Sequence, residues 1–190
     1  MRIRWTAFHE AGQVVAAWRI EIPLETATIA PTKTMAGSPL SKNPLRGVIL
    51  DYEDSDRARL LAEKAIIVAL AGQAAQRRYN PRSWRSYHGD DDRKIAVDLA
   101  LRLNGSSEAT SAYIKWLEIR AHDIIKQRWR QVEAVANALL EKGTLSGEEL
   151  RAVILASLTG PLIEAIRTAG GADVIPSPKS KSSGTGQRPT

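Results

Sequence analysis

The segment AIIVALAGQAA, residues 65–75, constrains the fold more than any other part of this chain. It lies between two charged segments, ARLLAEK and QRRY, and it is apolar nearly all the way round a helix. A helix that is apolar on every side has to be buried among other parts of the protein. With 190 residues the chain is long enough to bury it within one domain. The segment therefore predicts a buried central helix from about residue 55 to 79.

The remaining pattern predicts a mainly α fold, of the α+β type, with one small sheet near the N-terminus. Two β-branched segments, residues 26–30 and 47–52, are expected to pair as strands. Apolar residues recur at helical spacing in four further segments, at residues 5–19, 90–104, 107–142 and 146–157.

Local signals predict where several of these helices begin and end. Asp54 or Ser55 is expected to cap the central helix, and Ser146 with Glu149 has the spacing of a capping box. A last short helix is expected between Gly160 and Gly170. Trp116 and Trp129 fall close to one face of the predicted helix 107–142, where they are expected to pack against the core.

Three parts are expected along the chain. Residues 1–157 form the domain, and residues 158–175 form a helical extension. Residues 176–190, PSPKSKSSGTGQRPT, have the composition of a disordered tail.

Composition and charge limit the kinds of site and partner that the chain can have. The chain has no cysteine, which excludes disulfides and thiolate metal sites, so any metal must be held by nitrogen and oxygen ligands. The net charge is +6, but the basic residues are scattered, so nucleic-acid binding is not expected. No apolar run has the length of a membrane span, and the N-terminus lacks the apolar core of a signal peptide. These features favour a cytoplasmic protein.

The string HEAGQ, residues 9–13, differs from the zinc-protease signature His-Glu-x-x-His at its last position. One helical turn would place residues 9 and 13 on the same face, with Glu10 beside them. Gln13 stands where the second imidazole would be. Because an amide oxygen is a weak zinc donor, zinc binding is expected to be weak.

Five segments resemble the peptidase domain of the FtsH-type ATP-dependent zinc metallopeptidases. They occur in the family's order over about residues 5–155 and are TAFHEAGQVVAAW at the N-terminus, ATIAP (27–31), ALAGQAAQRR (69–78), DRKIAVDLA (92–100) and ANALLEKGTLSGEELRAVI (136–154).

The resemblance implies a role for each matching residue. His9 would be the first metal ligand, Asp92 the third ligand and Glu10 the general base, while Gln13 occupies the position of the second ligand. His9 and Asp92 should therefore approach each other in the fold. His88 could replace the missing ligand, although a solvated loop residue is the simpler interpretation. Gln76 stands where the family usually has an acid.

Three functions remain open. The first is a stand-alone zinc metallopeptidase domain with degenerate ligands, acting on unfolded polypeptide. The second is a catalytically inactive peptidase-fold protein that serves as a binding or scaffold protein. The third, a basic helical protein associated with nucleic acid, is disfavoured. The sequence has no GxxxxGK[ST] loop for ATP, so an unfoldase would have to be a separate partner. The chain could also form a homo-oligomer, and His122 is expected to be structural.

Overall fold

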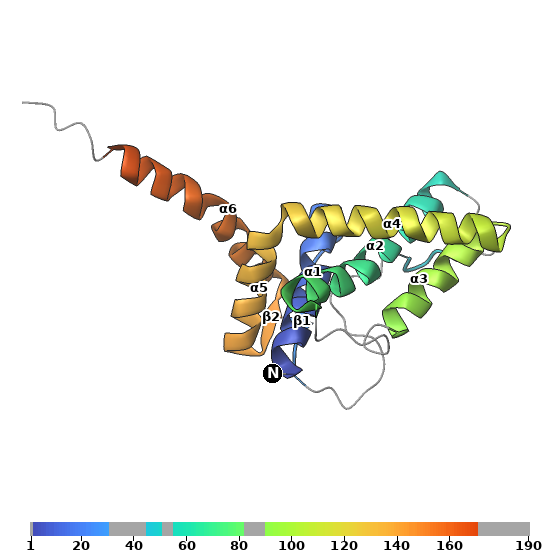
Figure 1. Ribbon diagram of the computed structural model, residues 1–190, viewed down its shortest axis with the longest axis horizontal. Coiled ribbons are helices and arrows are strands. Elements are labelled where there is room, and N and C mark those ends of the chain that lie inside the picture. The colour runs from blue at the N-terminus through green and yellow to red at the C-terminus, as the bar shows by residue number, and fades with distance from the viewer. Residues whose placement is uncertain (1, 31–44, 51–54, 82–89, 171–190) are drawn as a thin grey trace, which may run out of the picture. The chain divides into compact units, whose positions relative to one another are not determined.

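The computed structural model describes residues 2–30, 45–50, 55–81 and 90–170 of the chain (Figure 1). The fold is mainly helical with one small antiparallel sheet. Its elements are α1 (Arg2–Arg19), β1 (Thr26–Thr28), α2 (Asp56–Tyr79), α3 (Asp90–Leu103), α4 (Ser107–Gln127), α5 (Trp129–Lys142), β2 (Thr144–Ser146) and α6 (Gly147–Gly170).

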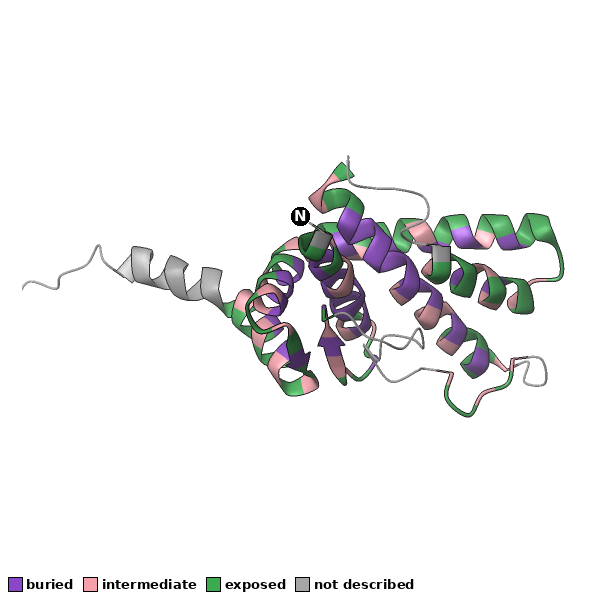
Figure 2. Ribbon diagram, turned by 90° about the horizontal axis from the view of Figure 1, so that it is seen from below, coloured by how far each residue is buried: buried purple, intermediate pink, exposed green. Residues whose placement is uncertain are grey.

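Helix α2 is the buried centre that the apolar segment predicts. Ser55 caps its first turn by accepting a hydrogen bond from the amide of Ala58, at 3.1 Å. Every residue from Ala69 to Gln76 is buried, and helices α1, α3 and α4 all pack against α2 (Figure 2). The charged residues at both ends of α2 remain outside the apolar stretch, which fixes its position along the core.

Helices α1 and α2 approach each other closely at Gly12. A Cβ atom at this position would lie 2.5 Å from the Cβ of Ala75 and 2.7 Å from the carbonyl oxygen of Ala71. These distances are shorter than van der Waals contact, so only glycine allows this approach. The close packing brings the HEAG segment of α1 directly against the middle of α2.

The prediction that residues 26–30 pair with residues 47–52 is wrong for the second of these segments. Strand β1 pairs with β2, and Ala27 lies opposite Leu145 in the register. Both of these side chains are buried, which gives the pairing an apolar face. Residues 45–50 form a turn, with Gly47 at φ 81°, instead of the first part of a strand. Residues 51–52 of the predicted strand lie outside the described residues.

The predicted helix 107–142 is two helices, α4 and α5, with a break at Arg128. Tertiary contacts next to the break explain it. The ring of Trp129 stacks on Phe8 of α1, with 5.6 Å between ring centroids, and the guanidinium of Arg78 lies 4.5 Å over the same ring. Arg78 also donates a hydrogen bond to the carbonyl of Lys126 in the last turn of α4.

Only one of the two tryptophans on this segment packs as expected. Trp129 is partly buried against the core. Trp116 is 46% exposed on α4, where the guanidinium of Arg120 lies 5.0 Å over its ring. The core-packing prediction is therefore wrong for Trp116: thirteen residues at about 100° each place it and Trp129 on different faces, and Trp116 lies off the buried face of α4 that Ile114 and Leu117 form.

The capping box at the start of α6 is confirmed. The amide of Ser146 donates to the Glu149 carboxylate at 2.9 Å, and the amide of Glu149 donates to Ser146 Oγ at 3.3 Å. A hydrogen bond from Lys142 and those from Ser146 lower the pKa of Glu149 to about 2. The box fixes the chain direction at the point where β2 ends.

Helix α6 continues to Gly170, so the separate short helix predicted after Gly160 is wrong. The chain divides into two compact units, Met1–Leu158 and Thr159–Thr190. The predicted tail, residues 176–190, lies outside the described residues. Among the helices of the described part, none combines the length and apolarity that a membrane crossing needs.

Candidate functional site

The fold brings His9 of α1 and Asp92 of α3 into contact. The Nε2 atom of His9 lies 2.8 Å from Oδ2 of Asp92, and the two side chains are 14% and 24% exposed. The expected approach of these two residues is confirmed. The neighbouring Asp91 points away from this contact, since its side chain is 94% exposed and pairs with Lys94. Among these two acids, Asp92 is the one at the site.

Gln13, one turn further along α1, contacts the Nε2 atom of His9. Its side-chain amide nitrogen lies 3.2 Å from Nε2 of His9, and the residue is buried. The spatial position of Gln13 is therefore the one that the sequence motif assigns to a second imidazole. Two polar groups, from Gln13 and Asp92, therefore converge on Nε2 of His9.

Gly72 of α2 makes room for the imidazole, a role that was not predicted from the sequence. A Cβ atom at position 72 would lie 2.7 Å from Nε2 of His9 and within 2.9 Å of two ring carbons. The ring therefore rests on the backbone of α2. A signal for this role was present, because a glycine in a helix interior costs about 1 kcal/mol relative to alanine and usually has a packing reason.

Gln76 lies one turn after Gly72 and is also buried. Its side chain is the smallest of the causes that raise the pKa of the His9 imidazole. The FtsH-type family, which the sequence resembles, usually has an acid at this position. We refer to His9, Glu10, Gln13, Gln76 and Asp92 as the His9 cluster.

The charges of the His9 cluster determine the state of the imidazole. Burial lowers the pKa of His9, but the hydrogen bond and charge of Asp92, the charge of Glu10 and the Gln76 hydrogen bond together outweigh burial and raise it. The Oε2 atom of Glu10 is itself buried. The hydrogen bond and charge of Asp92 are the main causes that hold the pKa of His9 above its ordinary value.

The donor set of the cluster does not fit a catalytic zinc. Tetrahedral ligands with bonds of about 2.1 Å lie about 3.4 Å apart, whereas Nε2 of His9 lies 2.8 Å from the Asp92 carboxylate and 3.2 Å from the amide nitrogen of Gln13, which is not a metal donor. Catalytic zinc, however, takes three ligands from imidazole, carboxylate and thiolate groups. This cluster offers one imidazole, one carboxylate and one neutral amide. Within the described part of the chain, no group of three or more His, Cys, Asp or Glu side chains could hold a metal ion.

Of the other two histidines, only His122 lies among the described residues. His88, the alternative ligand considered from the sequence, lies outside the described residues. His122 is exposed on α4, which disagrees with the structural role expected for it.

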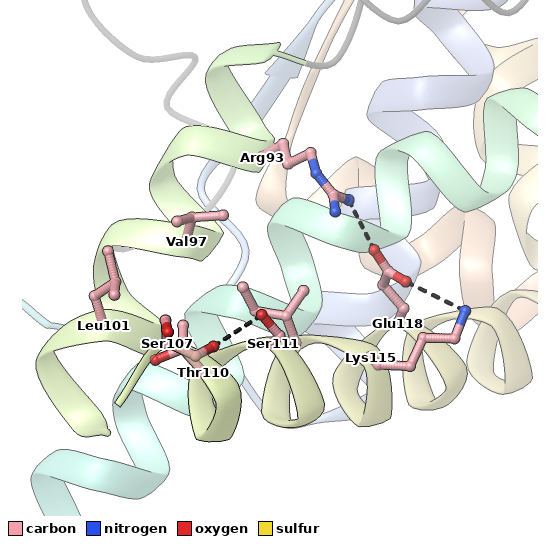
Figure 3. A pocket seen from close by; sticks show the side chains of 9 residues that line it. Arg93, Val97, Leu101, Ser107, Thr110, Ser111, Lys115 and Glu118 are labelled. Atoms are coloured by element: carbon pink, nitrogen blue, oxygen red, sulfur yellow. Dashed lines mark hydrogen bonds and ion pairs between the residues drawn. The ribbon is translucent and has the colours of Figure 1, made fainter. Parts of the chain in front are cut away.

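A second feature is an open groove of about 350 Å³ between α3 and α4 (Figure 3). Its apolar lining comes from Val97, Leu101 and Ile114. At one end, Thr110 and Ser111 donate their hydroxyl hydrogens to backbone carbonyls of the preceding turn, at 2.8 Å each. Their oxygens remain able to accept hydrogen bonds from a ligand.

The other end of the groove is charged. Arg93 donates to a carboxylate oxygen of Glu118 at 2.7 Å, and the ammonium of Lys115 lies 3.7 Å from the second oxygen (Figure 3). Two cations therefore share one carboxylate. Arg93 follows Asp92 directly, so the groove begins one residue from the His9 cluster on the same helix.

Comparison of the chain with protein-family models finds no match, and comparison with curated proteins also finds none. The resemblance to the FtsH-type peptidase domain therefore rests on the five ordered sequence segments and on the residues they carry over.

Proposed function

We propose that this chain is an FtsH-type peptidase-fold domain that binds unfolded polypeptide and does not cleave it. The observation that supports the proposal is the donor set around His9, in which an amide replaces an imidazole. The family resemblance allows either an active metallopeptidase or a catalytically inactive peptidase-fold protein. This observation favours the inactive protein.

The loss of catalysis follows from the chemistry of the cluster. In a zinc peptidase the metal supplies an activated water, and a glutamate removes its proton. Glu10 has the right place on α1 for that base. The contact with Asp92 helps to raise the pKa of His9, and a metal ligand must give up its proton, so this contact adds to the cost of binding a metal. Gln13 adds no donor strong enough to compensate for that cost.

We assign polypeptide binding to the groove between α3 and α4. Its apolar lining suits side chains of an extended segment, and its hydroxyl and charged ends offer hydrogen bonds to peptide groups. Leu101 is half exposed there, so it can be changed without opening the core.

Two measurements on the purified chain test the proposal at neutral pH. Metal analysis by mass spectrometry should find well below one zinc per chain. Fluorescein-labelled casein should show increased fluorescence anisotropy with the protein while its band on a denaturing gel stays intact. The Leu101→Glu variant should bind casein at least about tenfold more weakly, because a charge in an apolar contact is costly.

Two results would overturn the proposal. One is a single tightly bound zinc with casein cleavage that a chelator stops and that Glu10→Gln abolishes. That outcome would support the active metallopeptidase and point to His88 as the replacement ligand. The other is unchanged casein anisotropy, which would remove the binding function.

A further inference from the structure

The last turn of α2 carries two consecutive arginines, and the fold places this turn beside the junction of α4 and α5. The guanidinium of Arg78 lies 4.5 Å over the ring of Trp129, the first residue of α5. Arg78 also donates a hydrogen bond at 3.3 Å to the carbonyl of Lys126, which lies 48 positions further along the chain. These contacts bring two basic segments together. We refer to their cations as the basic cluster, which consists of Arg77, Arg78, Lys126, Arg128 and Arg130.

The basic cluster lacks the carboxylate partners that other cations of this protein have. Six cations elsewhere form ion pairs with Asp or Glu side chains, namely Arg93, Lys94, Arg102, Lys115, Arg120 and Lys142. Within the described part of the chain, four members of the basic cluster, Arg78 and the three at the junction, form no ion pair. The acids on either side of the junction, Asp123 and Glu133, are exposed. The positive charge of the cluster is therefore not balanced by direct contacts in the described fold.

Helix dipoles account for three of these cations but not for the arginines at the start of α5. Arg77 and Arg78 end α2, and Lys126 lies in the last turn of α4, where cations are favourable. Arg128 and Arg130 stand at the N-cap and in the first turn of α5, where a positive charge is unfavourable. That first turn has no acid, and no side chain caps it. The Nε atom of Arg128 is also buried with no hydrogen-bond partner among the described residues. The two arginines at this helix start thus reduce stability, which indicates a role outside folding.

A ligand with several negative groups would balance the basic cluster, and the residue types favour phosphates with bases attached. Four of the five cations are arginines, whose planar guanidinium binds a phosphate through two parallel hydrogen bonds. Tyr79 and Trp129 lie next to these arginines in the sequence, and both are only partly buried. Aromatic rings of this kind offer stacking contacts to the bases of a single strand.

A lipid surface fits the same residues less well. Binding at a membrane interface needs large apolar side chains that enter the bilayer. In the described part of the chain, none of the large exposed apolar residues belongs to residues 76–80 or 126–131. The cluster therefore has the charge for an anionic surface without the apolar contacts.

We infer that the basic cluster is a surface that binds single-stranded nucleic acid through its phosphates. This inference goes beyond polypeptide binding, because the cluster shares no residue with the groove between α3 and α4. Its cations are separated in the sequence and meet only through the contacts of Arg78. For this reason the distribution of charge along the sequence did not predict the surface.

Fluorescence anisotropy of a fluorescein-labelled oligothymidylate of about 20 nucleotides tests the surface. The natural chain should bind it, and the affinity should fall as salt rises from about 50 to 200 mM, because binding releases counterions. The double variant Lys126→Gln/Arg130→Gln removes two exposed cations. It should bind at least about tenfold more weakly at low salt, and its slope of log affinity against log salt should be shallower by about 1.4, or about 0.7 for each lost phosphate contact.

The matched control is Lys94→Gln/Arg102→Gln, which removes the same charge from two cations that have carboxylate partners on α3. It should weaken binding by less than about threefold, because salt screens charges that do not touch the strand. Thermal unfolding checks that the fold is retained. The Lys126→Gln/Arg130→Gln variant should melt near the temperature of the natural chain, since it loses one favourable and one unfavourable contact with a helix dipole.

Four outcomes would overturn the inference. Equal weakening by the control pair would show that net charge, and not this surface, holds the strand. Poly-glutamate that binds as tightly, with the same loss in the Lys126→Gln/Arg130→Gln variant, would assign the surface to an acidic polypeptide. Anionic phospholipid vesicles that bind with that same pattern would assign it to a membrane. Unchanged anisotropy of the oligonucleotide with the natural chain at low salt would remove the surface. Each outcome can occur whether or not casein binds in the groove, so this inference and the proposed function fail separately.

Discussion

Asp92 and Arg93 are neighbours on α3, yet their surroundings differ. Asp92 contacts His9 of α1 in a cluster where the two side chains are 14% and 24% exposed. Arg93 contacts Glu118 of α4 at the end of the groove, and these side chains are 52% and 26% exposed. Next to the first contact, Gly12 and Gly72 let α1 and α2 pack closely, and the His9 ring rests on the backbone of α2. In the second contact, the long side chains of Arg93 and Glu118 can change conformation while the helices stay in place. Substitutions should therefore affect stability strongly in the first region and weakly in the second.

The largest effect is expected for Gly12→Ala. The new methyl group would collide with the backbone carbonyl of Ala71 and with Ala75, so α1 and α2 would have to move apart. The free energy of unfolding should fall by about 2 kcal/mol or more, although alanine favours the helix itself. Chemical denaturation measures this.

Gly105→Ala is the control for that variant, because a Cβ atom there meets no atom within 4 Å. It should change the free energy of unfolding by less than about 0.5 kcal/mol. Equal effects of the two variants would mean that the α1–α2 contact is not tight.

Gly72→Ala should have the next largest effect. The added methyl group would overlap the His9 ring and displace it from Asp92. The lost charged hydrogen bond outweighs the gain in helix propensity, so the net loss should be about 1 kcal/mol. Proton resonances of the His9 imidazole, assigned by NMR, should also shift. If they do not, the ring does not rest on α2.

A smaller, pH-dependent effect is expected at the exposed capping box. Glu149 has its pKa lowered to about 2 from an ordinary value of 4.5, through Lys142 and Ser146. Its contribution is complete above pH 4.5 and is lost as the pH falls toward 2. The difference in melting temperature between the natural chain and Glu149→Gln should therefore shrink over this range. A constant difference from pH 7 to pH 2.5 would contradict this.

Glu118→Gln should have the smallest effect on stability. Exposed ion pairs contribute about 0 to 1 kcal/mol, and the cations of Arg93 and Lys115 stay in contact with water. The loss should be under about 1 kcal/mol and should shrink in high salt. A loss above about 2 kcal/mol would show that the end of the groove is as constrained as the His9 cluster.

Sequence patterns predicted the features that depend on nearby residues. The apolar run of α2 and the caps at Ser55 and Ser146 are local signals, and the structure confirms them. The approach of His9 and Asp92 came from family resemblance, because nothing in their own spacing predicts it.

The features that were missed depend on distant contacts. The break at Arg128 follows from the packing of Trp129 on Phe8, and the role of Gly72 follows from the position of His9. The partner of β1 was missed because its apolar face is completed by Leu145, far along the chain. In each case the deciding group is more than 50 positions away.

The pairing of β1 with β2 has a consequence for how the domain forms during synthesis. The hydroxyls of Thr28 and Thr144 lie 2.8 Å apart although 116 positions separate them along the chain. Closing so large a loop costs entropy before the contact returns any stabilisation, and long-range pairing of this kind slows folding. Strand β1 therefore leaves the ribosome before helices α2 to α5 and has no partner until β2 follows them. Its completion marks the moment at which the first and last segments of the unit Met1–Leu158 become one cooperative structure.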